Sequence, residues 1–402
     1  MEKKRGVKMD IKTMVEEIKD KLITFRRHLH QIPELAYEEF ETAKYITKIL
    51  SKLNGISVKT GIAKTGVVGL LKGSGKKTIA LRADIDALPI TEENDIVYKS
   101  KHKGKMHACG HDAHMSILLG TAIVLSKISK ELKGNVKFIF QPSEERTPGG
   151  AKRMIEEGVL KNPKVNAILG LHSDPRIPTG SIGYKPGVLM AFTSEFTINL
   201  QGKGGHAASP NRAIDPIVMA SVVIQEIQKI SSRWINPLEP VVVTIGSIHG
   251  GTTFNIISDN VELKGTVRVL NMKLVDKIIN HINNILKGIT KIYGGKYTLD
   301  FVKGYPVLKN DEKFTQFTVE VLKKTFGDKH ILKMENPLMG GEDFAYYLQK
   351  VPGTFLRLGT ANKNKKTNFL WHHSKFNIDE DALPVGVTAF VACTLNYLNN
   401  YE

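Results

Sequence analysis

Cysteine, aromatic residues and long apolar runs are all scarce in this sequence of 402 residues. Its two cysteines, Cys109 and Cys393, cannot form a disulfide framework, which favours a reducing, intracellular setting, and we predict a cytoplasmic protein. No apolar run approaches the roughly 18 residues needed to cross a bilayer. The segment from Met1 to Asp10 is charged and lacks the apolar core of a secretory signal. We therefore expect neither a membrane span nor a signal peptide.

Negative charge is also in short supply, because 57 Lys and Arg stand against 40 Asp and Glu, a net charge of +17. Clustered cations would indicate nucleic-acid binding, since they release counterions from phosphates. Here the cations are scattered, the denser groups at Lys99–Lys105 and Lys363–Lys366 are short, and the 7% aromatic residues do not alternate with them. We predict a solvated Lys-rich surface, which also accompanies heat adaptation and favours a thermostable protein. Binding of nucleic acid stays a remote alternative.

Several catalytic motifs are missing. The sequence contains no His-Glu-x-x-His helix, which excludes a zincin, and no Gly-x-Ser-x-Gly elbow, which weighs against a serine hydrolase. The stretch from Gly73 to Thr78 lacks both the first Gly and the Lys-Ser/Thr ending of a phosphate-binding loop. It predicts a polar turn between strands.

Strand-like and helix-like segments alternate through the first half of the chain. Apolar spacing predicts helices over Ile11–His30, Tyr37–Leu53 and Asp112–Ile128, and short apolar runs predict strands between and after them, the first at Gly66–Leu71. After Met190 the order changes to β-α-β-β-α-β, the ferredoxin-like layout. Alternation resumes from Tyr305. The simplest architecture is an α/β domain, residues 1–190 and 304–402, with a smaller domain inserted at 191–303.

Polar residues with catalytic or ligand chemistry follow the strand-like runs, where ligands bind in open α/β sheets. Five such groups occur along the chain: Asp84 with Asp86, the block from His107 to His114 that contains Cys109 and His111, Glu144 with Glu145, His172, and His372 with His373. Thiolate, imidazole and carboxylate are the ligands of zinc and similar ions, and a shared pair of ions needs five or more of them. We predict a metal-hydrolase site.

Two features of these groups sharpen the chemistry. Adjacent acids allow Glu145 to bind metal while Glu144 takes a proton from water. Cys109 as a nucleophile paired with His111 is disfavoured, because residues two apart do not face each other on a helix. A thiolate held by metal is the better interpretation.

These motifs form an ordered set that runs from about Ile18 to Leu383. The stretches are Phe25–Leu35, Arg82–Pro89, His107–His114, Gln141–Glu145, Gly202–Pro210 and Met339–Phe344. The set resembles the amidohydrolase branch of the aminoacylase and carboxypeptidase family of dinuclear zinc metallohydrolases, which includes hippurate hydrolases, auxin-conjugate hydrolases, N-acyl-amino-acid deacetylases and thermostable carboxypeptidases. The resemblance implies a zinc-peptidase-like three-layer α/β catalytic domain with an inserted ferredoxin-like α+β lid or dimerisation domain.

The resemblance also implies roles for individual residues. The metal ligands would be Cys109, His111, Glu145, His172 and His372, with the Cys109 thiolate bridging two divalent ions, zinc first, with Mn²⁺, Co²⁺ or Ni²⁺ as alternatives. Glu144 would be the general base and acid, and Asp86 would orient a ligand. The family usually has Pro after the final His pair, where this chain has Ser374. His373 therefore stays open as the last ligand, although the spacing to Phe376 favours His372.

The inserted segment carries a second polar set. By resemblance, His206 would reach into the site of a partner subunit to stabilise the oxyanion, while Asn255 and Arg268 hold the substrate carboxylate and Gly341 lies at the substrate. A homodimer or homotetramer formed through this segment is therefore expected.

The predicted function is metal-dependent hydrolysis of an amide bond next to a free carboxylate, in a small peptide or an N-acyl amino acid. Carboxypeptidase and aminoacylase activities share this machinery, and the motifs do not separate them. A specific N-acetyl-amino-acid deacetylase of amino-acid biosynthesis is the alternative within the enzyme class. A non-catalytic protein on the same fold would be expected to lack several ligands, and here the set is complete.

Overall fold

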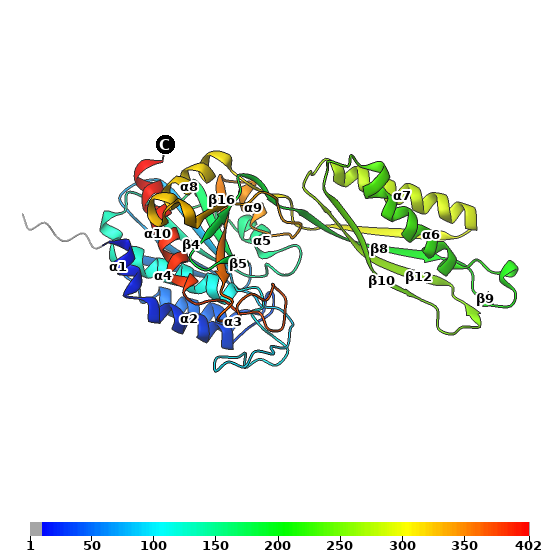
Figure 1. The fold of residues 1–402 in the computed structure, drawn as a ribbon, viewed down its shortest axis with the longest axis horizontal. Coiled ribbons are helices and arrows are strands. Elements are labelled where there is room, and N and C mark those ends of the chain that lie inside the picture. The colour runs from blue at the N-terminus through cyan, green and yellow to red at the C-terminus, as the bar shows by residue number, and fades with distance from the viewer. Residues whose placement is uncertain (1–9, 402) are drawn as a thin grey trace, which may run out of the picture. The chain divides into compact units, whose positions relative to one another are not determined.

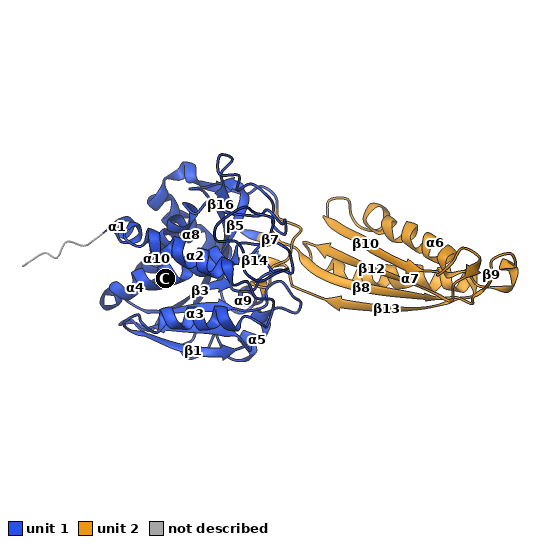
Figure 2. Ribbon diagram, turned by 90° about the horizontal axis from the view of Figure 1, so that it is seen from below, with its two compact units in different colours: residues 1–187, 309–336, 346–402 blue, residues 188–308, 337–345 orange. Residues whose placement is uncertain are grey.

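The computed structural model describes residues 10–401, which fall into two compact units (Figure 2). Unit 1 comprises residues up to Gly187 together with Lys309–Asn336 and the segment from Tyr346 onward. Unit 2 comprises Val188–Leu308 and Pro337–Ala345. The insertion predicted at 191–303 lies inside unit 2, which extends further on both sides and also takes in the short segment at 337–345.

Unit 1 is built on an eight-stranded sheet. The strands, in spatial order, are β1 (Ile56–Ile62), β2 (Gly66–Leu71), β4 (Asn135–Gln141), β3 (Thr78–Asp84), β5 (Ala167–Pro178), β16 (Gly353–Ala361), β6 (Ile182–Tyr184) and β15 (Ile331–Lys333). The four central strands, β4, β3, β5 and β16, run parallel, and antiparallel pairs flank them. Their carboxyl ends therefore meet at one edge of the sheet, as the predicted α/β layer requires.

Both faces of this sheet are covered, because β3 is buried at every position. Alternate residues such as Leu81 join the main core with five long helices and the short α1: α1 (Ile11–Glu16), α2 (Lys19–Gln31), α3 (Phe40–Leu50), α4 (His111–Lys127), α8 (Glu312–Phe326) and α10 (Ala382–Asn400). The opposite face carries the shorter α5 (Gly150–Glu156) and α9 (Ala345–Leu348) (Figure 1). There Met154 packs on Gly66, and Leu348 packs on Gly353. The predicted three-layer architecture is confirmed.

Helix α4 lies in the middle of the core and begins at the predicted site. It is buried on nearly all sides, as the apolar run after Asp112 predicts. Gly110 precedes it with φ +87°, and a Cβ there would lie 2.4 Å from Ser173 Oγ. Glycine is therefore required at this turn, which aims Cys109 and His111 at the ends of the strands.

Two of the predicted helix boundaries are wrong. The helix predicted over Ile11–His30 is two helices, because Ile18 leaves helical geometry (φ −109°, ψ 3°) with its side chain buried in the core. Helix α3 begins at Phe40 rather than Tyr37, because Tyr37 adopts a left-handed conformation with φ 63°. Local periodicity does not register either backbone turn, since both are set by packing.

Unit 2 has the predicted ferredoxin-like fold. Its elements follow the order β8 (Phe192–Gln201), α6 (Pro216–Lys229), β10 (Val241–Gly250), β12 (Asn260–Val269), α7 (Leu274–Tyr293) and β13 (Lys296–Lys303). The four strands pair antiparallel in the spatial order β10-β12-β8-β13. A core of its own lies between this sheet and the apolar faces of α6 and α7, with Val223 and Ile282 fully buried. Two short strands, β9 (Gly205–His206) and β11 (Ile256–Ile257), form a separate ladder.

The expectation that no segment is apolar and long enough to span a membrane needs one correction. Helix α10 is long and apolar enough to cross a bilayer, but 72% of its most apolar stretch is buried inside the protein. Its residues Val387 and Phe390 belong to the core of unit 1. Packing against α4 and α8 accounts for its apolar character.

Candidate metal centre

The carboxyl ends of three parallel strands and the start of α4 bring the predicted ligands of unit 1 together. Asp86 follows β3, Glu144 and Glu145 follow β4, and His172 lies on β5. Cys109 and His111 enter from the turn before α4, and His372 comes from the loop between β16 and α10. Residues more than two hundred positions apart in the sequence thus lie together in one cluster.

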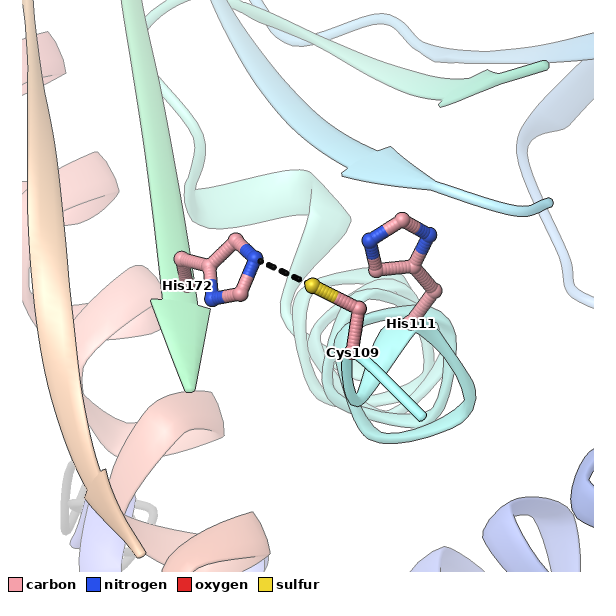
Figure 3. Close-up of side chains that lie close together, drawn as sticks. All are labelled: Cys109, His111 and His172. Atoms are coloured by element: carbon pink, nitrogen blue, oxygen red, sulfur yellow. Dashed lines mark hydrogen bonds between the residues drawn. The ribbon is translucent and has the colours of Figure 1, made fainter. Parts of the chain in front are cut away.

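Two overlapping groups of ligand atoms share Cys109. In the first, atoms of Cys109, His111 and His172 all lie within 4.8 Å of one another, and Cys109 Sγ is 3.3 Å from His172 Nε2 (Figure 3). In the second, Cys109, Glu145 and His372 meet the same limit. One thiol common to two groups is what a bridging ligand between two metal ions requires.

The histidine rings are oriented to offer lone pairs to this cluster. His111 Nδ1 donates to the carbonyl oxygen of Asp86 at 2.8 Å, and His172 Nδ1 donates to that of Ser173 at 2.8 Å. A carbonyl only accepts, so each Nδ1 carries a proton, and Nε2 is the nitrogen that can bind a metal once it has lost its own proton. In both rings this Nε2 atom is the one that faces the ligand cluster. This second layer of contacts is typical of metal-bound histidine.

Two buried atoms at the centre fit a cation. His111 Nε2 and Glu145 Oε1 have no hydrogen-bond partner within residues 10–401. Burial, together with the carboxylates of Glu145 and Glu144, raises the pKa of the Cys109 thiol well above its usual value. Burial opposes protonation of His111, but the carboxylates around it, Asp84 first, outweigh that effect and raise its pKa to about 10. The cluster therefore concentrates negative charge, and divalent ions would neutralise it.

Asp86 organises the carboxylates from behind. It is fully buried, and its two oxygens accept the backbone N–H groups of Glu144 and Glu145, each at 2.9 Å. Its own carbonyl orients His111. Oxygen atoms of Glu144 and Glu145 lie within 4.8 Å of His111 as well. One residue thus positions three of the predicted functional side chains.

The structure places His372, not His373, in the cluster. His372 Nε2 lies 3.5 Å from Glu145 Oε2, and its backbone adopts φ 64° while its N–H donates to the carbonyl of Ala108 at 2.8 Å. His373 instead stacks on Phe369 with ring centroids 4.7 Å apart. The side chain of Ser374, at the position where the family usually has Pro, donates to Glu93 at 2.8 Å.

Of the three imidazoles in the block from His107 to His114, only His111 joins the ligand groups that contain Cys109. His114 Nδ1 donates to Asp84 at 2.6 Å and its Nε2 accepts the N–H of Ser173 at 2.9 Å, so neither nitrogen has a lone pair for a metal. The bond to Ser173 means that His114 anchors the strand that carries His172. His107 is buried, and burial lowers its pKa to about 3.

Residues from the N-terminal segment support the site in ways the sequence analysis missed. Arg26 Nε and His30 Nδ1 both contact Asp112 Oδ2 at 2.8 Å, next to His111. Glu39 accepts the N–H of Ser143 at 2.9 Å, next to Glu144. The stretch Phe25–Leu35, one of the motifs that carry the resemblance, was a usable signal for Arg26 and His30. Glu39 had no such signal.

The polar residues of unit 2 lie at opposite ends of its sheet. His206 pairs with Ile256 in the β9–β11 ladder, and the carbonyl of Asn255 accepts the N–H of Ala207 at 3.1 Å, so His206 and Asn255 are neighbours. Arg268 lies near the far end of β12, and the eight residues of strand from Asn260 span about 26 Å. A single copy of unit 2 therefore cannot bring Asn255 and Arg268 to one carboxylate.

Gly341 belongs to the Arg268 end of this unit. Arg268 is paired with Thr193 across β12 and β8, and a Cβ on Gly341 would lie 2.2 Å from Thr193 Cγ2. Only glycine fits against Thr193. Two of the three residues predicted at the substrate, Arg268 and Gly341, thus flank the same strand residue, Thr193.

Comparison with known proteins agrees with this geometry. The family model described as Peptidase family M20/M25/M40 matches residues 80–396. Thermostable carboxypeptidase 1 of Saccharolobus solfataricus is 40% identical over 97% of this chain and 98% of its own length. N-acetyl-L-cysteine deacetylase of Bacillus subtilis is 42% identical over 93% of this chain and 89% of its own.

A solved structure extends the comparison to three dimensions. A dinuclear metal-binding peptidase of the M20 family from Bacillus subtilis superposes with a TM-score of 0.81 at 36% identity, covering 96% of this chain and 99% of that one. The predicted family and fold are confirmed, and so is the prediction of a hydrolase. The chain therefore belongs to peptidase family M20/M25/M40, whose members hydrolyse amide bonds.

Proposed function

We propose that this protein uses two divalent metal ions to hydrolyse an amide bond next to a free carboxylate, in peptides or N-acyl amino acids. The observation that carries the proposal is the pair of ligand groups sharing Cys109, with Glu144 beside them. One ion would be held by His111 and His172, the other by Glu145 and His372, and the Cys109 thiolate would bridge them. Sulfur, imidazole and carboxylate ligands together favour Zn²⁺, with Mn²⁺, Co²⁺ and Ni²⁺ as alternatives.

The residues divide the chemistry between them. When bound, the ions would supply Lewis acidity that polarises the scissile carbonyl and lowers the pKa of water. Glu144 accepts the proton of the attacking water and returns it to the departing amine. Asp86 holds Glu144 and Glu145 at their backbone N–H groups, so the acid-base carboxylate and the ligand carboxylate keep separate positions.

The general base is tested by Glu144→Gln. Because general acid-base catalysis contributes about 10²- to 10⁴-fold, kcat is expected to fall by that factor while elemental analysis finds both metal ions retained. The exposed Glu156, on α5, gives the matched control Glu156→Gln, which is expected to keep the activity of the unmodified enzyme. Wild-type turnover in the Glu144 variant would refute the proposed mechanism.

The bridging thiolate is tested separately by Cys109→Ser. A serine hydroxyl is a poor substitute for a thiolate between two ions, so metal content is expected to fall below two per chain. Equilibrium dialysis against Zn²⁺ followed by elemental analysis measures this. Two fully bound ions in the variant would show that Cys109 does not bridge.

For the substrate class, we propose carboxypeptidase or aminoacylase activity, with specific N-acetyl-amino-acid deacetylation as the alternative. The relatives at about 40% identity are named for both peptide and N-acetyl substrates. Assays of N-acetyl amino acids, N-benzoyl amino acids and N-protected dipeptides with each of the four metals distinguish them. Cleavage of only one N-acetyl amino acid would favour the alternative.

We further propose that the protein acts as a homodimer, or as a homotetramer built from two such dimers, formed through unit 2. Strand β10 is an edge of its sheet, and the apolar side chains of Ile248, Ile217 and Val218 are exposed on β10 and α6. The strand from Asn260 to Arg268 spans about 26 Å, so His206 and Asn255, which lie beyond its Asn260 end, would serve the active site of the partner.

Complementation tests this arrangement. Glu144→Gln and His206→Ala subunits are each expected to be inactive alone, and co-expression with different tags yields mixed dimers. In a mixed dimer the site with an intact Glu144 would receive His206 from the other subunit, restoring about half of the dimer's activity. No restored activity in isolated mixed dimers would assign His206 to its own subunit's site.

A reducing, cytoplasmic location and thermostability complete the proposal. Both cysteines are buried and free, and Cys109 must remain a thiol to bind metal. Retention of both metal ions after incubation at high temperature tests the second property, and precipitation at moderate temperature would refute it.

A further inference from the structure

One fully buried carboxyl group takes no part in the proposed mechanism. Glu39 precedes α3 and has none of its surface exposed. Its Oε1 accepts the N–H of Ser143 at 2.9 Å, and its Oε2 accepts the hydroxyl of Thr65 at 2.5 Å. Burying a carboxyl group is costly unless its oxygens are satisfied, so these two contacts define its position.

The residue that Glu39 holds has an unusual backbone. Ser143 is buried and its backbone adopts φ 55°, a left-handed conformation that residues other than glycine rarely take. Its N–H is bound by Glu39, and its carbonyl accepts the N–H of Gly150 at 2.9 Å. Both backbone polar groups of Ser143 are therefore anchored, which keeps the strained turn in place.

This turn sets the direction of the general base. Three consecutive backbone N–H groups after β4 donate to two carboxyl groups. The N–H of Ser143 donates to Glu39, and the N–H groups of Glu144 and Glu145 donate to Asp86. Asp86 holds the two glutamates together but not the residue before them. The backbone of Ser143 determines where Glu144 leaves the strand, and Glu39 supports that backbone.

We propose that Glu39 is a positioning residue for Glu144, acting through the N–H of Ser143. The inference rests on the proposed function, because it requires Glu144 to be the general base. Glu39 belongs to none of the ligand groups in residues 10–401, so its loss is expected to leave the metal ions in place. A displacement of about 1 Å in a catalytic group costs up to 10²-fold in rate.

The first test compares two substitutions at this position. Glu39→Leu removes the acceptor for Ser143, so kcat is expected to fall 10- to 100-fold with KM unchanged and two metal ions per chain. Glu39→Gln retains a carbonyl acceptor for Ser143 and is expected to keep kcat within about threefold. Glu38→Leu is the matched control, because the neighbouring Glu38 is exposed and its side chain pairs with the surface residue Lys105. Wild-type kcat in Glu39→Leu, or loss of metal from it, would overturn the proposal.

The second test asks whether Glu39 acts through Glu144. If it does, adding Glu39→Leu to Glu144→Gln is expected to lower the residual rate no further, whereas independent effects would multiply. Multiplied losses would overturn the positioning role and leave Glu144 as the base. Full activity in Glu144→Gln alone would instead refute the proposed function, so the two failures are distinguishable.

A further variant covers the case in which Glu39→Leu does not fold. Glu39→Asp keeps the charge but shortens the side chain by one methylene, which draws Ser143 away from its present position. Its kcat is expected to fall about tenfold with unchanged KM and metal content. Wild-type kcat in this variant would overturn the proposal.

Discussion

The predicted functional residues of the two units differ in burial. In unit 1, Asp86 and His111 are fully buried and their orientation is set by hydrogen bonds to neighbouring residues. In unit 2, His206 and Asn255 are exposed on a short two-stranded ladder. A buried polar centre is stable only when its charges are balanced, so unit 1 is organised to receive cations. An exposed pair carries no such penalty and is suited to a surface that forms on assembly.

Ion pairs show the same contrast. In unit 1, Arg26 and Asp112 are both 1% exposed at the side chain and 2.8 Å apart. In unit 2, Lys303 and Asp276 are 2.9 Å apart, but 54% and 80% exposed. The distances are nearly equal, so any difference in their energetic effect must come from solvent.

The largest effect is expected from Arg26→Leu. Removing this guanidinium leaves the Asp112 carboxylate buried without its principal cation, which costs about 3–5 kcal/mol in the free energy of unfolding. Chemical denaturation monitored by circular dichroism measures the loss. The adjacent Arg27, 44% exposed and paired with Glu380, provides the control Arg27→Leu, with an expected loss of at most about 1 kcal/mol. Equal losses would break the comparison.

A smaller effect, dependent on pH, is expected from Glu39. Burial, with the charge of Asp86, raises the pKa of Glu39 from 4.5 to about 7. The native state therefore holds a proton that the unfolded chain has released, so stability falls as the pH rises from 4.5 to 7. One unit of pKa corresponds to about 1.4 kcal/mol, so the loss reaches about 3 kcal/mol.

This pH dependence is measured on metal-free protein against Glu39→Gln, in which it is expected to disappear. Glu38→Gln should retain it, because Glu38 is exposed. If the free energy of unfolding changes with pH equally in the native protein and in Glu39→Gln, another group causes the effect.

Metal removal is expected to lower the free energy of unfolding by as much as the titration of Glu39 does, or by less. Ions that bind only the folded state stabilise it by about 2.7 kcal/mol at a hundredfold excess over Kd, so a chelator should lower Tm. Scanning calorimetry with and without chelator measures the shift, and Cys109→Ser should show a smaller one. An unchanged Tm in the native protein would argue against a structural contribution of bound metal.

The smallest effect is expected from Lys303→Met in unit 2. Exposed pairs contribute little because water screens them, so the free energy of unfolding should change by no more than about 0.5 kcal/mol. The same denaturation assay checks it. A loss of the size expected for Arg26→Leu would end the proposed contrast between the units.

Much of the fold was predictable because it depends on local patterns. The strand at Gly66–Leu71 has the predicted bounds, and the β-α-β-β-α-β order after Met190 produced the ferredoxin-like unit. The break at Ile18 was not predictable, because apolar spacing continues through it. Helical periodicity reports which face is buried, not where tertiary packing interrupts the backbone.

The candidate site was also predictable only in part. Ligand chemistry was legible in the sequence, since thiol, imidazole and paired acids at strand ends have few other uses. The choice between His372 and His373, and the exclusion of His114 as a ligand, required knowing which hydrogen bonds each ring makes. Those partners come from segments far apart in the chain, so no spacing rule reveals them.

The sequence by itself determined the kinds of groups available, Cys109 and its neighbours above all, together with their order along the chain and the two-unit organisation. Tertiary structure decided which nitrogen of each histidine faces the cluster, which carboxyl group lies among the candidate ligands and which accepts hydrogen bonds behind them. The reason is physical. Donor type is a property of one residue, whereas orientation, burial and pKa are set by contacts that exist only once the chain has folded.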